Sequence, residues 1–269
     1  ENDLVAASFG RGFYVLDDYS PLRNFSNEIL KSKGHLFPIK DGKWFIQRSN
    51  LGNTGADFYL ADNPKYGVTM TYHLSDNYET KSEKRKKSEK LLNQKLLNVP
   101  FPGYDNLDEE KSETPAYVKI SIEDQDGNII RHLKERAGKG THRITWDLRH
   151  MFKGSVTDSN KKNNLRGPIV KPGKYSATLY LVEGGLTKKL SERKSFELKP
   201  IYKSLLKGTS FENYNKYVDD YFKVYNEVES IENKLKTTDE KLKSLKIAIE
   251  NTPINTDELV LDFHNLKTS

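Results

Sequence analysis

The sequence predicts a mainly β protein with added helices, in which an immunoglobulin- or fibronectin-like β-sandwich is followed by a helical hairpin. Two observations predict the sandwich. Apolar and polar residues alternate with period two through residues 117–122. Six or seven strand-like segments also fall within about 130 residues, without the regular alternation of strand and helix that βαβ units show. The hairpin is predicted by a change after residue 200, where apolar residues recur at helical spacing.

The sandwich is centred on a predicted hairpin. Residues 117–122 form its first strand and residues 129–133 its second, because residues 126–128 (Asp-Gly-Asn) tolerate the positive φ of a tight turn. A third strand, residues 144–148, places alternate apolar residues on one face. We predict that Trp146, the largest of them, anchors the core.

The N-terminal segment predicts two strands, residues 3–8 and 12–17, joined by a glycine-containing turn. Residues 13–16 are continuously apolar, which is typical of a strand covered on both faces. Two strands are not stable alone in water. We therefore expect this pair to belong to a larger structure, and the chain to be part of a longer protein.

Three domains follow from the remaining pattern: residues 1–62, residues 63–200 as the sandwich, and residues 201–269 as the helical hairpin. The first domain ends in a connecting segment with little regular structure. Residues 66–74 alternate and are predicted as the first strand of the sandwich, and a basic helix at about 81–97 is inserted after it.

The helical hairpin is predicted from two capping signals. Ser210 can cap a helix that runs to about residue 235 and carries an aromatic stripe. Thr237 and Glu240 stand in capping-box register for a second helix, residues 241–249. The short polar link between them predicts an antiparallel pair.

Composition limits the function classes. There are no cysteines, so disulfides and thiolate sites are excluded. The net charge is +6, but the excess lies in residues 81–95, and the rest of the chain is nearly balanced. A nucleic-acid-binding protein would spread basic residues over a face with aromatics, so we expect no nucleic acid partner. No apolar run is long enough to span a bilayer, and no leader pattern opens the chain.

Three blocks together resemble a known family. Residues 3–23, which include Phe-Gly-Arg-Gly-Phe-Tyr-Val-Leu-Asp-Asp, are similar to the closing blade of bacterial sortilin-like (VPS10/BNR-repeat) β-propeller proteins. Residues 63–72 resemble the join to the next domain. Residues 140–149 (with Thr-Trp-Asp-Leu-Arg) and 167–175 resemble the immunoglobulin-like, FlgD-type domain that follows the propeller. The propeller's Asp-box does not occur in this chain.

The resemblance implies that residues 1–62 are a terminal propeller blade with its connecting segment. It implies an exported bacterial protein (periplasmic, outer-membrane-associated or extracellular), whose partner is the upstream propeller of the same protein. It supplies no catalytic residues. If the parent protein is an enzyme, the resemblance implies a glycoside hydrolase.

Four patterns contain residue types that could carry chemistry, and a structural role is favoured for each. Residues 124–128 have oxygen ligands that suggest a calcium loop, but they lack its terminal Glu, so a turn is the better account. Asp17 and Asp18 have no identifiable partner carboxylate for glycoside hydrolysis. His132 and His142 could approach each other as a two-histidine metal site. Asp147 and Arg149, on the polar face beside Trp146, are expected to take part in a cross-strand ion pair with Arg143.

The leading hypothesis is a non-catalytic accessory region that braces the propeller and mediates protein–protein contact, with no cofactor and no metal. The alternative is a part of a glycoside hydrolase or glycan-binding protein, whose active site lies mainly on upstream blades. A weaker idea gives the basic helix a lipid or acidic partner. The candidate contacts are aromatics that could stack on sugars and the basic helix, namely Trp44, Phe45, Tyr59, Lys84, Arg85, Lys86 and Lys87.

Overall fold

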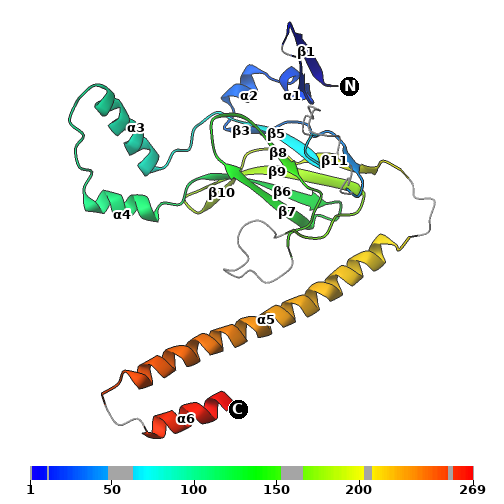
Figure 1. The fold of residues 1–269 in the computed structure, drawn as a ribbon. Coiled ribbons are helices and arrows are strands. Elements are labelled where there is room, and N and C mark those ends of the chain that lie inside the picture. Colours follow the sequence, from blue (N-terminus) through cyan, green and yellow to red (C-terminus); the bar gives the residue numbers. More distant parts are fainter. Residues whose placement is uncertain are drawn as a thin grey trace. The chain divides into compact units, whose positions relative to one another are not determined.

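A computed structural model describes residues 2–10, 12–47, 63–152, 166–202, 208–253 and 257–268 (Figure 1). The fold is mixed α/β, with about 31% strand and 36% helix. The chain divides into two compact units. The first comprises Glu1–Met151 and Arg166–Leu205, and the second comprises Phe152–Leu165 and Leu206–Ser269.

Two sheets form the core of the first unit. The larger sheet has the strand order β4-β11-β9-β6-β7, with β10 paired to β9, and only the β4–β11 pair is parallel. Its strands are β4 (Gly42–Trp44), β6 (Tyr117–Asp124), β7 (Ile129–Arg136), β9 (Gly173–Glu183), β10 (Leu186–Lys189) and β11 (Lys194–Pro200). The smaller sheet is antiparallel, with β5 (Val68–Leu74) between β3 (Gly34–Leu36) and β8 (Gly140–Trp146).

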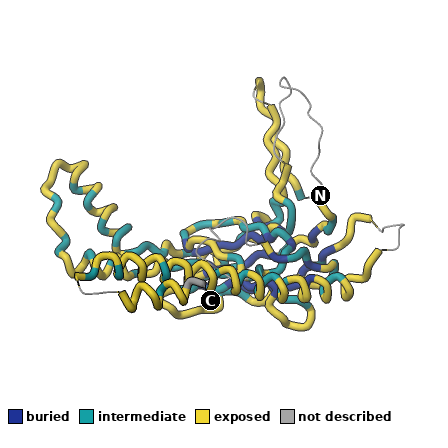
Figure 2. Tube along the Cα trace, turned by 60° about the horizontal axis from the view of Figure 1, so that its bottom comes forward, coloured by how far each residue is buried: buried dark blue, intermediate teal, exposed yellow. Residues whose placement is uncertain are grey.

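Trp146 joins the two sheets into one hydrophobic core. Its side chain is fully buried, and its ring centroid lies 5.3 Å from that of Tyr175 in β9 and 6.1 Å from that of Phe196 in β11. The indole N–H donates to the carbonyl of Arg149 at 2.9 Å, so its one polar group is satisfied. Figure 2 shows the buried residues gathered in these sheets. The prediction that Trp146 anchors the core is confirmed.

The predicted central hairpin is confirmed as β6 and β7. The carboxylate of Asp124 accepts hydrogen bonds from the backbone N–H groups of Asp126 and Asn128, which fixes the turn. The third predicted strand does not extend this hairpin. It is β8, which pairs with β5 in the smaller sheet, with Trp146 opposite Val68.

The segment after residue 33 is more regular than the sequence predicts. Its residues form β3, which pairs with β5, and β4, which pairs with β11. Close packing explains Gly42, since a Cβ there would lie 2.4 Å from Cγ2 of Val68. Strands within the predicted connecting segment therefore hydrogen-bond to strands of the predicted sandwich domain; the three-domain division itself stays a prediction.

The predicted N-terminal strand pair is present as the hairpin of β1 (Leu4–Ser8) and β2 (Gly12–Leu16). Two short helices follow, α1 (Ser20–Arg23) and α2 (Asn27–Lys31). The hydroxyl of Ser26 caps α2 by accepting from the N–H of Ile29.

Between β5 and β6 the chain leaves the sheets in an excursion, residues 75–116, that contains two helices. The predicted basic helix is α3 (Lys81–Gln94), which begins with a capping box between Thr80 and Glu83. A second helix, α4 (Tyr104–Ser112), was not predicted, because the prolines and glycine before it suggested only a stop.

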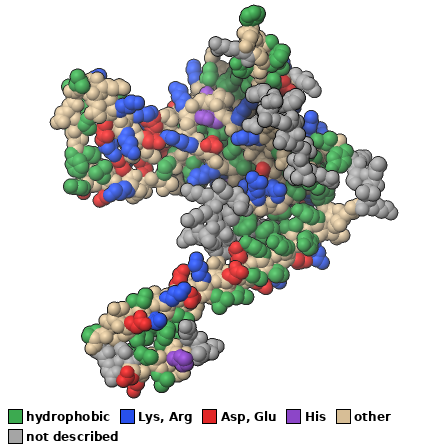
Figure 3. All heavy atoms as spheres, in the orientation of Figure 1, with side chains coloured by type: hydrophobic (Ala, Val, Ile, Leu, Met, Phe, Trp, Pro, Cys, Tyr) green, Lys and Arg blue, Asp and Glu red, His purple; other side chains and the backbone are tan. Residues whose placement is uncertain are grey.

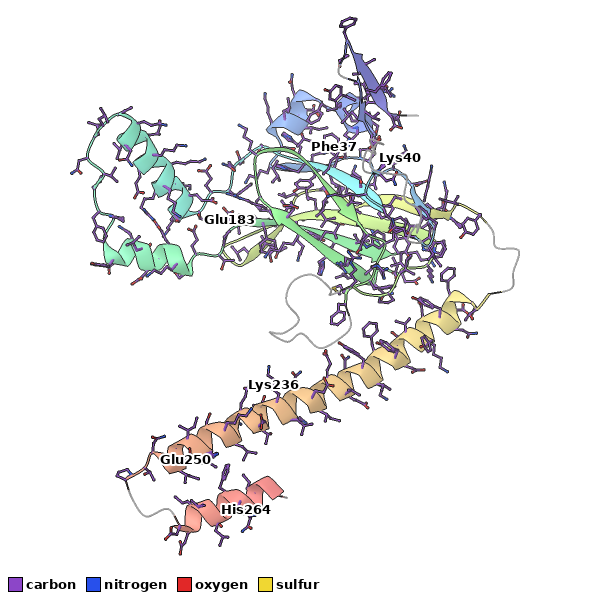
Figure 4. All side chains as sticks on the ribbon, viewed as in Figure 1. Phe37, Lys40, Glu183, Lys236, Glu250 and His264 are labelled. Carbon is purple, nitrogen blue, oxygen red and sulfur yellow. The ribbon has the colours of Figure 1, made fainter. Side chains whose placement is uncertain are left out.

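The second unit contains one long helix, α5 (Phe211–Glu250), and the shorter α6 (Asp257–Thr268), which contacts it. The predicted break near residue 236 is wrong. The hydroxyl of Thr237 donates to the carbonyl of Asn233 at 2.8 Å instead of capping a new helix, so the helix continues. Figure 4 labels Lys236 within the uninterrupted helix.

Candidate interaction site

The β1–β2 hairpin exposes apolar side chains on both of its faces. In its antiparallel register Val5 lies opposite Val15, and Ala7 lies opposite Phe13, on one face. Leu4 lies opposite Leu16, and Ala6 opposite Tyr14, on the other. Phe13 is 78% exposed and both valines are 59% exposed. A stable sheet buries the apolar side chains of at least one of its faces. Both faces of the β1–β2 hairpin are apolar, and neither is buried.

The base of the hairpin is held firmly. The carboxylate of Asp3 accepts from the N–H of Asp18 at 2.9 Å, and the carbonyl of Asn2 accepts from the N–H of Tyr19 at 2.7 Å. The guanidinium of Arg143, in β8, donates to the carbonyls of Asp17 and Asp18. The connection from β2 is therefore tied to the smaller sheet.

These contacts correct the predicted ion pair beside Trp146. Arg143 contacts backbone carbonyls of the N-terminal segment and not Asp147. Among the described residues, Oδ1 of Asp147 is buried without a hydrogen-bond partner. Asp18 sits in the left-handed region at φ 48° and accepts from the hydroxyl of Ser20, so its side chain shapes the turn into α1.

Two of the predicted glycan-stacking aromatics, Trp44 and Phe45, are engaged in packing. Trp44 is half-buried against the core, and its indole N–H donates to the carbonyl of Val170 at 2.7 Å. Phe45 is half-buried, and its ring packs edge-on against Tyr66 at 4.8 Å. Tyr59 lies outside the described residues. Trp44 and Phe45 are therefore occupied by packing contacts and do not form an open platform with each other.

The basic helix α3 carries the predicted contacts Lys84, Arg85, Lys86 and Lys87, of which all except Arg85 are exposed. The Nε of Arg85 lies 2.6 Å from Oε1 of Glu110 in α4, and a second nitrogen donates to Oε2 at 2.8 Å. The bidentate guanidinium holds the pKa of Glu110 below its ordinary value. Lys87 pairs with Glu79.

Helix α4 offsets much of the charge of α3. Residues 104–113 contain five acidic residues and one basic residue. Besides Glu110, Glu109 pairs with Lys81 at 2.6 Å, and Glu113 accepts from the backbone N–H of Lys81. The carboxylates of α4 thus neutralise much of the positive charge of α3 within the same excursion. This weakens the interpretation that α3 binds a lipid or an acidic partner.

A row of lysine and tyrosine crosses the larger sheet. Lys119 in β6 lies directly opposite Lys134 in β7 and, on its other side, opposite Tyr180 in β9, which in turn lies opposite Lys189 in β10. The ammonium of Lys134 lies 3.9 Å from the ring centroid of Tyr117, and that of Lys119 lies 5.3 Å from the ring of Tyr180. Among the described residues neither of these two lysines has a carboxylate partner.

Directly opposed like charges destabilise a sheet. The positive charge of Lys119 also acts on His132, which lies on the same face. Burial is the main cause that lowers the pKa of His132, and Lys119 lowers it further. The row is therefore a feature that folding alone does not favour, and sequence reasoning missed it because it looked for charge along the chain and not across strands.

The histidines make structural contacts. Nδ1 of His132 lies 3.1 Å from the hydroxyl of Ser121, and Nε2 of His142 lies 2.8 Å from the carbonyl of Gly138. The ring of His142 also stacks on Tyr72. The predicted approach of His132 to His142 as a metal pair gains no support. Within the described ranges, no group of three or more acidic or histidine side chains is placed to hold a metal ion.

Two depressions in the first unit are lined in part by charged side chains. One, of about 430 Å³, is lined by Glu79, Glu113 and Glu183, the last labelled in Figure 4. Each of these carboxylates already has a basic or backbone partner. The other, of about 520 Å³, is lined in part by Asp124 and Arg193. Burial works against the charged form of Asp124, but its hydrogen bonds from the turn outweigh burial and lower its pKa.

Comparison with known proteins adds no assignment, since no family model, no curated protein and no solved structure matches this chain. None of the helices in the described part of the chain combines the length and the apolar character needed to cross a membrane.

Proposed function

We propose that this chain is a non-catalytic accessory region of an exported bacterial β-propeller protein, in which the β1–β2 hairpin joins the propeller and the remainder braces it and offers surfaces to other proteins. One observation carries the proposal: the hairpin is apolar on both faces and exposed on both faces. Its occupant is the β-structure of the propeller, because the same residues resemble a closing blade.

The contacts at the base of the hairpin support a bracing role. Arg143 ties the residues after β2 to β8, and β8 carries Trp146 at the centre of the core. A propeller blade attached through β1 and β2 would therefore be coupled to a well-packed body. In this proposal the two sheets and their shared core correspond to the immunoglobulin-like, FlgD-type domain.

Amide hydrogen exchange tests the proposal. The chain of 269 residues is compared with the complete gene product, following amides of residues 4–8 and 12–16. We expect fast exchange in the chain and strong protection in the complete protein, because docking would pair and cover the strands. Fast exchange in both would overturn the proposal.

A variant pair sharpens the test. Val5→Lys with Val15→Lys places two charges on one face of the hairpin and should abolish the protection in the complete protein. Leu186→Lys, at a 66% exposed position of β10, is the matched control and should leave the protection unchanged.

The lysine–tyrosine row supports a second candidate function, binding of an anionic polysaccharide. Opposed Lys119 and Lys134 lose their mutual repulsion when an anion lies between them. Tyr117 and Tyr180 place aromatic rings beside these ammonium groups, and sugars stack on such rings. This retains the glycan alternative but moves it from Trp44 and Phe45 to the outer face of β6, β7 and β9.

Binding to a polyuronate, measured by calorimetry, tests this second function. Lys119→Gln with Lys134→Gln should weaken binding at least tenfold, whereas Lys84→Gln with Lys86→Gln, which removes the same charge from α3, should leave it within twofold. Equal losses in both variants would indicate only nonspecific attraction, and no binding by the unmodified chain would reject the function.

A further inference from the structure

Helix α5 carries an unbroken heptad pattern along its whole length. Counting from Tyr214, every position a and d up to Ile249 is apolar or tyrosine except Thr238, and the hydroxyl of Thr238 is satisfied by the carbonyl of Lys234. The a positions are Tyr214, Tyr221, Val228, Leu235, Leu242 and Ile249, and the d positions are Tyr217, Val224, Ile231, Thr238 and Leu245. A pattern of five heptads is typical of a coiled coil.

The a and d positions together form a seam along the helix, and much of this seam is exposed to solvent. The six seam residues from Tyr217 to Leu235 are 49–68% exposed. On an adjacent face of the helix Val218 is buried, and Phe222 packs edge-on against Phe152 at 5.8 Å. Figure 3 shows hydrophobic side chains displayed along α5. Between Tyr217 and Leu235 the seam is thus distinct from the face that carries Val218 and Phe222.

We propose that a second copy of this chain covers the seam, as an antiparallel two-stranded coiled coil of α5 with α5. In antiparallel pairing, positions a and d of one helix face d and a of the other. The layers formed are Val228 with Ile231, Val224 with Leu235, and Tyr217 with Leu242, each occurring twice by symmetry. Thr238 then meets Tyr221, so this layer brings together two residues that carry hydroxyls.

Charge complementarity selects the partner and its direction. With this register Asp220 faces Lys241 of the second copy, and Glu227 faces Lys234, so four attractive pairs flank the seam. All four residues are exposed, and among the described residues they have no ion pair within the chain. A parallel pair would instead place Glu227 against Glu232 and Lys241 against Lys246, which repel, with only Lys234 against Asp239 attractive. The pairing does not depend on the propeller proposal.

Sedimentation velocity of the 269-residue chain at tens of micromolar is the first test. We expect a dimer that Ile231→Glu, at the central layer, converts to monomer. Ser230→Glu adds the same charge at the neighbouring, outward position and should leave the dimer intact. A monomeric parent chain, or a dimer that Ile231→Glu does not change, would overturn the proposal.

A surface charge reversal, which does not threaten folding, tests the register. Lys234→Glu with Lys241→Glu makes all four flanking pairs repulsive and should weaken dimerisation at least tenfold. Adding Asp220→Lys and Glu227→Lys to the same protein should restore it. Failure of the fourfold variant to recover would contradict the antiparallel register.

Spin labels test whether the two helices run antiparallel or parallel. The chain has no cysteine, so a single introduced cysteine carries the label at one known position. Labels at Glu212→Cys would lie about 50 Å apart along the axis in the antiparallel dimer, at 1.5 Å per residue. Labels at Ser230→Cys would lie close together. A short distance from the Glu212→Cys label would indicate a parallel dimer and reject the proposal.

Discussion

At the scale of single residues, two positions that meet across β5 and β8 decide much of the core. Trp146 fills the space between the sheets, and Gly67 lies against its backbone. A Cβ on Gly67 would lie 1.8 Å from the carbonyl oxygen of Trp146, and its φ of +129° also disfavours any other residue. The glycine before β5 is thus explained by the tryptophan at the end of β8.

Trp146→Ala should lower the free energy of unfolding of the first unit by about 3–5 kcal/mol, because it removes a fully buried aromatic ring and leaves a cavity. Urea unfolding followed by circular dichroism in the far ultraviolet measures the loss. Trp146→Phe should cost less, and Leu186→Ala, at an exposed position, should stay within about 0.5 kcal/mol of the parent. Equal losses for the alanine variants would contradict the role of Trp146.

Stability should also fall on mild acidification. His35 and His73 lie opposite each other on β3 and β5, and the pKa of each is lowered, chiefly by burial. The unfolded chain restores their ordinary pKa. As the pH falls through the ordinary histidine value, the unfolded state takes up protons that the folded state resists, so stability is fully present above that value and declines below it.

Urea midpoints at pH 7.5 and pH 5.5 measure this effect. The variant His35→Gln with His73→Gln should show a smaller drop between the two pH values than the parent chain. An unchanged drop would assign the pH dependence to other groups.

At the scale of elements, the excursion between β5 and β6 shows why a charge run does not by itself mark a binding site. Helix α3 is basic, but α4 supplies carboxylates to it. The exposed Lys81–Glu109 pair contributes little to stability, whereas the Arg85–Glu110 pair is largely covered and positions the two helices. The start of α3 depends instead on its capping box.

Thr80→Ala should destabilise the first turn of α3 by about 1 kcal/mol, since the N–H of Glu83 loses its acceptor. Amide exchange within residues 81–84 measures the change. Thr80→Ser keeps the hydroxyl and should retain most of the protection. If Thr80→Ser exchanged as fast as Thr80→Ala, the hydroxyl would not be the cause.

At the scale of the whole molecule, the two units differ in what stabilises them. The first has a buried core drawn from two sheets, whereas Val218 is the buried hydrophobic residue among the described part of the second. A long helix with one buried apolar residue gains little from its own packing. We therefore expect the second unit to depend on association of α5.

Two probes should separate the units during thermal unfolding. Both tryptophans, Trp44 and Trp146, belong to the first unit, so tryptophan fluorescence reports that unit alone. Ellipticity at 222 nm reports mainly helix, of which α5 is the longest described. The ellipticity change should come at lower temperature and shift upward with protein concentration. Coincident transitions without concentration dependence would contradict this expectation.

The amino-acid sequence by itself determined the local features of this protein. The alternation of apolar and polar residues determined β5, β6 and β8, and the Asp-Gly-Asn turn determined the β6–β7 hairpin. The caps at Ser26, Thr80 and Ser210 determined where three helices begin. Each of these features depends on neighbours within a few residues. Only the tertiary structure decided that β8 pairs with β5, that β3 and β4 join the sheets as edge strands, and that Arg143 reaches Asp17 and Asp18 and not Asp147. It also decided that Thr237 continues α5 and that Lys119 faces Lys134. These outcomes depend on partners tens of residues away or on competition between equivalent local hydrogen bonds, which local sequence does not resolve.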